Sequence, residues 1–203
     1  MWLLGLGWAA WGALHSLLIS PTWMAVFSRR FPWACPYYRL AYNGLAAATL
    51  LPLLFFKHSL AGEVLLAWAG PLALVRWGLL LAAAWLAWAG AREYDLGWVS
   101  GLAQLRSGCT YASGPYAAEL RTTGILRHVR HPWYGSALLL LWAHTREFDA
   151  ANLVTSAVLT LYVLVGARLE EQKLIRVHGQ EYHEYRARTP MFFPRPRFKD
   201  LLR

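Results

Sequence analysis

The 203-residue chain contains little acidic charge and few cysteines. It has 11 Asp and Glu residues against 20 Lys and Arg, and charged residues make up 15% of the chain. Apolar residues make up 57%, which excludes a disordered protein because a chain this apolar can bury a core. With 12 Trp, this composition indicates that much of the chain lies in an apolar solvent, and an integral membrane protein is the first hypothesis.

The two cysteines, Cys35 and Cys109, are far apart and belong to no CxxC or Cys/His spacing. They therefore predict neither a zinc site nor a disulfide framework, and no metal is expected. From Met1 the chain runs directly into apolar residues without a basic segment. A cleaved signal peptide is therefore not expected, and the first span is expected to stay.

Five apolar segments are candidates for membrane-spanning helices, which need about 20 residues to cross a bilayer. They are Trp2–Phe27, Leu40–Phe56, Val75–Ala91, Trp133–His144 and Leu153–Ala167. Arg76 is expected at a membrane interface or within the third span, where a long side chain reaches toward water. The last two segments predict a tight helical hairpin that is tilted or incompletely spanning, because the first of them is too short to cross unaided.

The sequence thus predicts an all-α integral membrane protein with about five transmembrane helices. Residues 1–91 are expected to form three N-terminal spans. Residues 92–203 are expected to contain a polar connection up to His131, the hairpin and a charged tail helix that begins at Arg168 and ends near Pro190. The connection is too polar for lipid and too long for a simple turn, so it is a candidate functional segment.

The excess of basic residues predicts an orientation. If the hairpin returns to its starting side, every Lys and Arg except Lys57, Arg76 and Arg146 shares one face. By the positive-inside rule this face is cytoplasmic, with the N-terminus outside and the C-terminus inside the inner membrane of a bacterium. Nucleic-acid binding is not expected, because the cations are split among loops beside the membrane and are not interleaved with aromatics on one soluble surface.

One polar motif opens the predicted hairpin. Residues Gly124 to Gly135 include two Arg, two His and Tyr134 beside the start of an apolar helix. Pro132 suits the first turn of that helix, whose free N–H groups favour an anion, and Arg130 and His131 add donors. The alternative interpretation is a positively charged stop beside a membrane helix.

A second motif lies in the tail. If the tail is helical, five of its residues lie three or four positions apart and therefore share one face, and Gly179 is expected to break the helix. These are Glu171, Leu174, His178, Tyr182 and Tyr185. A carboxylate and two Tyr side chains at the membrane edge are suited to the ammonium and ribose groups of a ligand. The alternative is an amphipathic helix whose Tyr residues anchor at the level of the lipid headgroups.

The order and spacing of these motifs carry a family resemblance. An RHPxYxG-like turn at Arg130, the sequence EExxL from Glu170, GxxYxxY from Gly179 and PxxxP from Pro190 follow one another. This combination resembles the C-terminal half of the isoprenylcysteine carboxyl methyltransferase superfamily. The N-terminal half resembles the NnrU-like and methanethiol S-methyltransferase-like branch through three short sequences, His15-Ser16, Tyr38-Arg39-Leu40 and Tyr94-Asp95.

The resemblance implies methyl transfer from S-adenosylmethionine, held between the connection, the start of the hairpin and the tail helix. It implies that the cofactor is bound by His131, Pro132, Tyr134, Gly135, Glu170, Glu171, Tyr182 and Tyr185. Catalytic roles would fall to His131, Arg130 and Glu171. His15 is a substrate-side candidate because polar residues are expensive in membrane helices, and a satisfied buried histidine is the alternative. The chain departs from the family in two places: the family often has Gly-x-Tyr-Arg where this chain has Gly124-Ile125-Leu126-Arg127, and this chain has Tyr134-Gly135-Ser136 where the family has its Gly one place later.

The implied acceptor is lipidic or small and apolar and enters from the bilayer. A prenylated or other carboxylate, a thiol and a phospholipid amine all remain open, and the oligomeric state is not predicted. Two alternatives are a non-catalytic NnrU-like protein of nitrogen-oxide metabolism and a nicotinamide-dependent membrane reductase. The short chain argues against the reductase, which usually has a ten-helix body.

Overall fold

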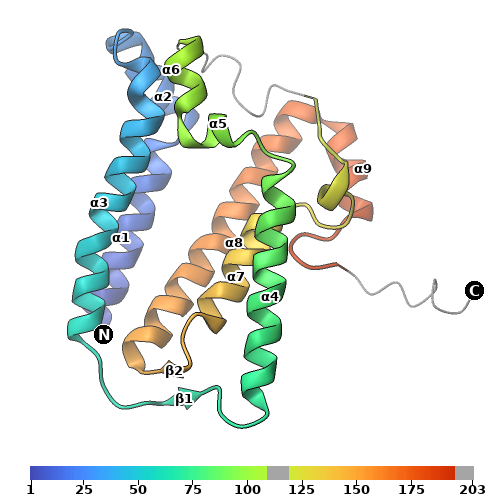
Figure 1. Ribbon diagram of the computed structural model, residues 1–203. Helices are drawn as coiled ribbons and strands as arrows, with labels where there is room; N and C mark the ends of the chain where they lie inside the picture. Colours follow the sequence, from blue (N-terminus) through green and yellow to red (C-terminus); the bar gives the residue numbers. More distant parts are fainter. Residues whose placement is uncertain (109–118, 195–203) are drawn as a thin grey trace, which may run out of the picture.

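The computed structural model describes residues 1–108 and 119–194, and the described part is almost wholly helical. Figure 1 shows long helices running roughly along one axis, joined at one end by a short two-stranded ribbon. The all-α class is therefore confirmed. Of the features named from the sequence, Cys109 and the tail beyond Pro194 lie outside the described residues.

The first apolar stretch forms two helices rather than one. Helix α1 (Trp2–Leu18) and helix α2 (Pro21–Arg30) meet at an angle of 57°. Ser20 caps α2 by accepting a hydrogen bond from the backbone N–H of Trp23, and Pro21 has no N–H with which to continue α1. The prediction of a single helical span over Trp2–Phe27 is therefore wrong in its geometry.

The second and third spans form where they are predicted and are slightly longer. Helix α3 (Tyr38–Ser59) follows a short 3₁₀ turn, η1 (Cys35–Tyr37), and helix α4 covers Leu72–Ala91. Cys35 is buried and disulfide-bonded, which the sequence spacing did not predict. The tertiary fold, rather than sequence separation, decides which cysteines meet.

Arg76 lies near the start of α4 and donates hydrogen bonds to the neighbouring helix. Its guanidinium donates to the backbone carbonyls of Ala143, His144 and Thr145, at distances of 2.9, 3.3 and 3.1 Å. The last carbonyls of a helix have no partner within the helix and carry partial negative charge. Arg76 therefore caps the C-terminal end of helix α7 (Pro132–Ala143).

Two short helices fill part of the polar connection. Helices α5 (Leu96–Ser100) and α6 (Leu102–Ser107) are separated by Gly101, whose φ of +97° favours glycine. Arg39 and Asn43 of α3 both donate to the carbonyl of Val99 at 3.1 Å. The connection is thereby fastened to the N-terminal part of the molecule. A 3₁₀ turn, η3 (Gly124–Arg127), then leads to α7.

The predicted C-terminal hairpin is present, but its second arm is much longer than predicted. Helix α7 is followed by strand β2 (Glu147–Phe148), which pairs antiparallel with β1 (Leu66–Ala67), and by α8 (Ala150–His178). The tail helix predicted from Arg168 is a continuation of α8, because nothing at that position breaks the backbone. The break comes at Gly179, with φ of +55°, before α9 (Gln180–Arg188).

The helices pack around two small cores. One joins α4 and the η3 region through Leu86, Ala89, Ile125, Leu126 and Val129, with Leu139 of α7 packed against it. The other joins α1 to α8 through Leu4, Trp8 and Ala151, with α3 packed beside them. Trp8 also donates from Nε1 to Oγ1 of Thr155 at 2.9 Å, so the contact between α1 and α8 includes a buried hydrogen bond.

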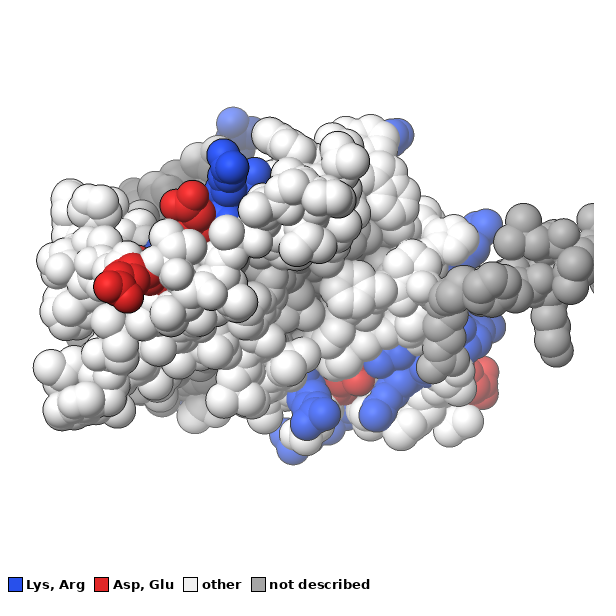
Figure 2. Space-filling model, turned by 90° about the horizontal axis from the view of Figure 1, so that it is seen from below, with Lys and Arg blue, Asp and Glu red and all other residues white. Residues whose placement is uncertain are grey.

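Much of the outer surface is apolar, as expected of helices in lipid. Within residues 1–108 and 119–194, three helices are long and apolar enough to cross a membrane, namely the η1–α3 segment, α4 and α8, and the bent pair α1–α2 makes a fourth candidate span. The apolar window of the η1–α3 segment has no buried residue. Figure 2 shows a large uncharged surface, with the charged side chains gathered in a few places. The chain is therefore an integral membrane protein.

Helix α7 does not meet this length requirement. Its 12 residues span about 18 Å at a rise of about 1.5 Å per residue, against a hydrocarbon core of about 30 Å. It packs extensively against α4. The prediction of an incompletely spanning first arm of the hairpin agrees with this length.

Candidate functional site

The turn before α7 is held by backbone contacts to the chain that follows α9. His131 is the residue before the first helical position, and Pro132 occupies that position. The backbone N–H groups of Arg130 and His131 donate to the carbonyls of Pro190 and Met191, at 3.0 and 2.9 Å. Two segments that are about 60 residues apart in sequence are thereby fixed side by side.

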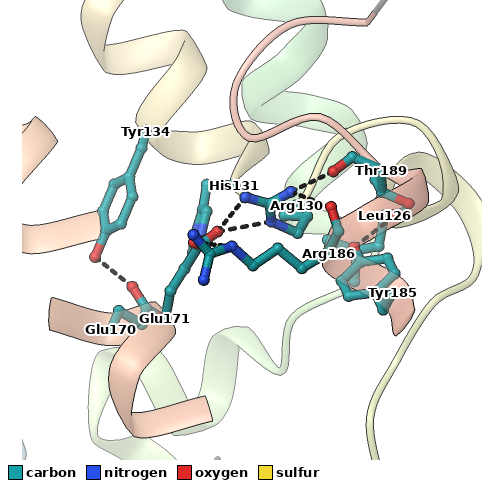
Figure 3. Close-up of polar contacts among 9 residues, drawn as sticks. All are labelled: Leu126, Arg130, His131, Tyr134, Glu170, Glu171, Tyr185, Arg186 and Thr189. Carbon is teal, nitrogen blue, oxygen red and sulfur yellow. Dashed lines mark hydrogen bonds and ion pairs between the residues drawn. The ribbon is translucent and has the colours of Figure 1, made fainter. Parts of the chain in front are cut away.

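Glu171 is the centre of the polar cluster between these segments (Figure 3). It lies on α8 and is 4% exposed. Its Oε1 accepts from Nε and Nη2 of Arg130 at 2.6 and 2.5 Å, while Nε of Arg186 lies 3.4 Å from Oε2. The Arg130 side chain is 8% exposed, so this is a buried charge pair that needs hydrogen bonds on both sides.

Further carbonyl groups complete the surroundings of Arg130. Its Nη1 donates to the carbonyl of Arg186 at 3.1 Å and also to that of Thr189. The guanidinium therefore joins three elements, namely the turn before α7, α8 and the end of α9. With its donors engaged in this way, Arg130 holds Glu171 in place, and the structure gives it a positioning role.

His131 has one ring nitrogen without a hydrogen bond. Its Nε2 lies 3.4 Å from Oε1 of Glu171, within reach of an ion pair, but it makes no hydrogen bond among the described residues. The ring is stacked on that of Tyr134 with centroids 5.4 Å apart. Because the side chain of His131 is 5% exposed, this nitrogen is a buried polar atom available to a ligand.

Tyr134 and Glu170 form a second polar contact on the open side of the cluster. The hydroxyl of Tyr134 donates to Oε2 of Glu170 at 2.7 Å. Figure 3 shows this pair apart from the Arg130–Glu171 pair, across the α8 backbone. The two adjacent carboxylates of α8 therefore point to different partners, Glu171 to arginine and Glu170 to a tyrosine.

Tyr182 and Tyr185 of α9 are both buried inside the protein and are not at a headgroup surface. The hydroxyl of Tyr185 donates to the carbonyl of Leu126 at 2.6 Å, whereas that of Tyr182 has no hydrogen-bond partner among the described residues. Burial raises the pKa of Tyr185 to about 12. Burial, with the charge of Glu171, also raises the pKa of Tyr182, so both phenols are hydrogen-bond donors at neutral pH.

We expect Tyr185→Phe to lower the free energy of unfolding by about 1–3 kcal/mol, because the buried carbonyl of Leu126 loses its donor. Tyr182→Phe is the matched control, since it removes a hydroxyl with no partner among the described residues. Unfolding of both variants in mixed detergent micelles measures the difference. Equal losses in the two variants would contradict the assigned hydrogen bond.

Gly135 allows the closest backbone approach in the cluster. A Cβ atom at this position would lie 2.6 Å from the carbonyl oxygen of Phe192 and 3.5 Å from Leu86. The segment after α9 therefore rests directly on the first turn of α7. Gly135 is thus a packing position that lets the two segments meet, and its contact with a cofactor stays a prediction.

His15 is the one predicted site residue that does not join this cluster. It lies on α1, is 3% exposed, and its Nδ1 is 2.6 Å from the carbonyl oxygen of Trp11. The other predicted residues come together from α7, α8 and α9. The sequence did not point to Thr189, Met191 or Phe192, because their contacts use backbone carbonyls that no side-chain pattern reveals.

The cluster fits the groups of S-adenosylmethionine in its donor set. It offers the carboxylates of Glu170 and Glu171 for an ammonium or ribose, and the half-exposed side chain of Arg186 for a carboxylate. The buried Nε2 of His131, which lies beside Glu171, and the hydroxyl of Tyr182 add two polar atoms that make no hydrogen bond in the described part of the chain. Within residues 1–108 and 119–194, no group of His, Cys, Asp and Glu is arranged to hold a metal.

Comparison with curated proteins gives the family. A methanethiol S-methyltransferase 2 of Bradyrhizobium diazoefficiens is 32% identical over 187 residues, which cover 89% of this chain and 68% of the relative. The chain belongs to the methanethiol S-methyltransferase family. The family resemblance read from the motifs is therefore confirmed, and it extends over the N-terminal half as well.

Other members of the family match over shorter stretches. A methanethiol S-methyltransferase of Pseudomonas deceptionensis is 33% identical over 119 residues, or 58% of this chain and 42% of the relative. One of Crocosphaera subtropica is 38% identical over 76 residues, or 37% of this chain and 29% of the relative. The matched part is thus less than half of each of these two relatives. No family model and no solved structure matches the chain.

Proposed function

We propose that this chain is a membrane methyltransferase that transfers a methyl group from S-adenosylmethionine to the sulfur of a small apolar thiol. The observation that carries the proposal is the 32% identity to a methanethiol S-methyltransferase over 89% of the chain. Among the acceptors left open by the sequence, these relatives favour the thiol over a prenylated carboxylate or a phospholipid amine. The relatives also favour a methyltransferase over the reductase and over the non-catalytic protein.

The proposed cofactor site is the cluster around Glu171. Glu170 and Glu171 would serve the ammonium and ribose, and Arg186 the carboxylate, while His131, Pro132 and Tyr134 would line the pocket. When bound, S-adenosylmethionine supplies a methyl group on a positively charged sulfur. Displacement at that carbon needs little acid or base help once the nucleophile is an anion, so the protein contributes mainly positioning and exclusion of water.

The chain's own residues would contribute in distinct ways. Arg130 keeps the Glu171 carboxylate charged and aimed by donating to it from two nitrogens. Tyr134 orients Glu170 through its hydroxyl. The apolar helices hold water away and admit an apolar acceptor from the bilayer.

Turnover of a labelled methyl group tests the proposal. The purified protein, in detergent or lipid nanodiscs, would be incubated with S-adenosylmethionine carrying a deuterated methyl group and with methanethiol. We expect labelled dimethyl sulfide in the headspace by gas chromatography, and saturable binding of S-adenosylmethionine by calorimetry. Binding without transfer to any thiol, carboxylate or lipid would overturn the enzyme and favour the non-catalytic alternative.

We also propose the orientation and the division into two parts. The N-terminus would lie outside and the C-terminus in the cytoplasm of a bacterial inner membrane, because the basic residues near the end of α2, the start of α7 and the end of α8 would then share the cytoplasmic side. Residues 1–91 would form the three N-terminal spans, while residues 92–203 would contain the cytoplasmic connection, the helical hairpin and the tail helix and carry the cofactor site.

Reporter fusions test this orientation. A fluorescent protein that folds only in the cytoplasm, fused after Arg203, is expected to fluoresce, whereas alkaline phosphatase at the same point should be inactive. Fusions after Ser59, between α3 and α4, should behave in the opposite way. The reverse pattern at both points would invert the proposed topology.

A further inference from the structure

A second candidate site lies outside the Glu171 cluster, between α1, α2 and α3. It is a pocket of about 230 Å³ with apolar and aromatic walls. The hydroxyl of Tyr38 is turned out of the pocket, since it donates to the carbonyl of Leu18 at 2.6 Å. The ring of Tyr38 packs against that of Phe27 with centroids 4.6 Å apart. The pocket thus offers rings and methyl groups rather than polar atoms.

The size of the pocket limits its occupant. Pockets for drug-sized ligands measure roughly 300–1,000 Å³, and one water molecule has a share of liquid volume of about 30 Å³. A pocket of about 230 Å³ is below the usual size for a drug-sized ligand, so it suits a small molecule rather than a whole lipid or prenyl chain. Its walls select an apolar molecule, since no wall residue is charged.

A buried imidazole borders this pocket. His15 contacts Tyr42, a wall residue, with ring centroids 5.8 Å apart and the rings edge to face. Leu18, one turn further along α1, is also part of the wall. His15 is therefore a buried polar side chain behind this wall of the pocket, and the Glu171 cluster does not use it.

The tautomer of His15 follows from its hydrogen bond. Nδ1 lies 2.6 Å from the carbonyl oxygen of Trp11, and because a carbonyl only accepts, Nδ1 carries the hydrogen. In a neutral ring Nε2 then has the free lone pair. That atom is buried and has no partner among the described residues. A buried acceptor in an apolar place is suited to a ligand that brings a donor.

We propose that this pocket binds the methyl acceptor as a small alkanethiol, with His15 as the base that takes the thiol proton. The inference rests on the proposed methyltransferase function and names where its acceptor sits. In the step, the S–H bond breaks, the proton goes to Nε2, and the electron pair stays on sulfur. Methylation consumes the thiolate, and the imidazolium returns its proton to water.

Helix α8 links this pocket to the Glu171 cluster. The hydroxyl of Tyr162 lies 3.1 Å from Oγ of Ser16, next to His15, and Glu170 is eight residues further along the same helix. Eight residues correspond to about 12 Å of helix. An elongated cofactor held at the cluster can therefore extend toward the acceptor.

A pocket-filling variant tests the location. Ala41 lies in the pocket wall, and Ala48, two turns along α3 and also exposed, does not. We expect Ala41→Leu to raise the KM for ethanethiol at least 10-fold. In the absence of cofactor, the saturation-transfer NMR signal of ethanethiol should also be lost with this variant. Ala48→Leu should leave both within about twofold, and S-adenosylmethionine should bind equally to both variants.

A change at His15 tests the base. We expect His15→Gln to lower kcat with ethanethiol by about 100-fold at pH 7, the usual scale for losing a positioned base, and His58→Gln, at the exposed end of α3, to have no effect. The deficit should shrink as the pH rises toward the pKa of the free thiol, because a thiolate needs no base. A pH-independent loss would reduce His15 to a packing residue and overturn its assignment.

The outcomes separate this inference from the proposed function. A wild-type protein that methylates no thiol overturns the function itself. Turnover by the wild type with an unchanged KM in Ala41→Leu overturns the pocket alone. An effect of Ala41→Leu that appears only with dodecanethiol would assign the pocket to a lipid chain and also overturn the inference.

Discussion

Glu171→Ala is expected to lower the free energy of unfolding by about 3–5 kcal/mol and to weaken S-adenosylmethionine binding at least 10-fold. The stability loss follows because Arg130, 8% exposed, would keep its charge without a counter-charge. The binding loss follows because the turn before α7 and the end of α9 would no longer be held around a common carboxylate. Unfolding in mixed micelles and calorimetric titration measure the two effects.

Two further variants sharpen this test. Glu181→Ala removes a carboxylate from an exposed position of α9 and should change both quantities little. Glu171→Gln keeps the shape and one acceptor oxygen but not the charge, so it should show most of the loss if charge compensation dominates. Wild-type stability in Glu171→Gln would show that hydrogen bonding alone holds the cluster.

Gly135→Ala is expected to destabilise the protein by about 1–3 kcal/mol, although alanine normally favours a helix. The new Cβ would meet the carbonyl oxygen of Phe192 at 2.6 Å, a backbone atom that cannot rotate away. Gly166→Ala on α8 is the matched control, since its Cβ would meet nothing within 4 Å. That variant should be neutral or more stable by up to about 1 kcal/mol.

Both glycine variants are measured by the same unfolding titration, with the cofactor affinity as a second quantity. Gly135→Ala should also weaken cofactor binding, because the segment after α9 would be pushed off α7. A destabilised Gly166→Ala would indicate a contact of α8 outside the described residues or with a second copy. Equal stability of the two variants would show that the segment after α9 yields easily.

The sequence predicted the membrane helices and the residues that meet at the cluster, because both leave local patterns. Apolar runs revealed α3 and α4, and the spacing from Glu171 to Tyr185 placed three buried residues on one stripe. The break at Gly179 was also visible, since glycine tolerates positive φ.

The parts that were missed depend on contacts between distant segments. The bend between α1 and α2 comes from one Ser-Pro pair inside an apolar run, which hydropathy alone does not register. The sequence also could not show that Arg130 and Glu171, 41 residues apart, neutralise each other, or that Arg76 caps α7. Such pairings follow from how the helices pack, and helix packing leaves no short-range periodicity.

The continuity of α8 has a mechanical consequence. The helix is unbroken for 29 residues, from the membrane-spanning half to the carboxylates of the cluster. Glu171 lies 21 residues from Ala150, or about 32 Å along a rod, so a tilt of about 5° about the outer end would displace it by roughly 3 Å. Helix tilt responds to bilayer thickness. The thickness of the surrounding bilayer is therefore coupled, through the tilt of α8, to the position of Glu171. Membranes of different thickness should change the alignment of the charged cluster.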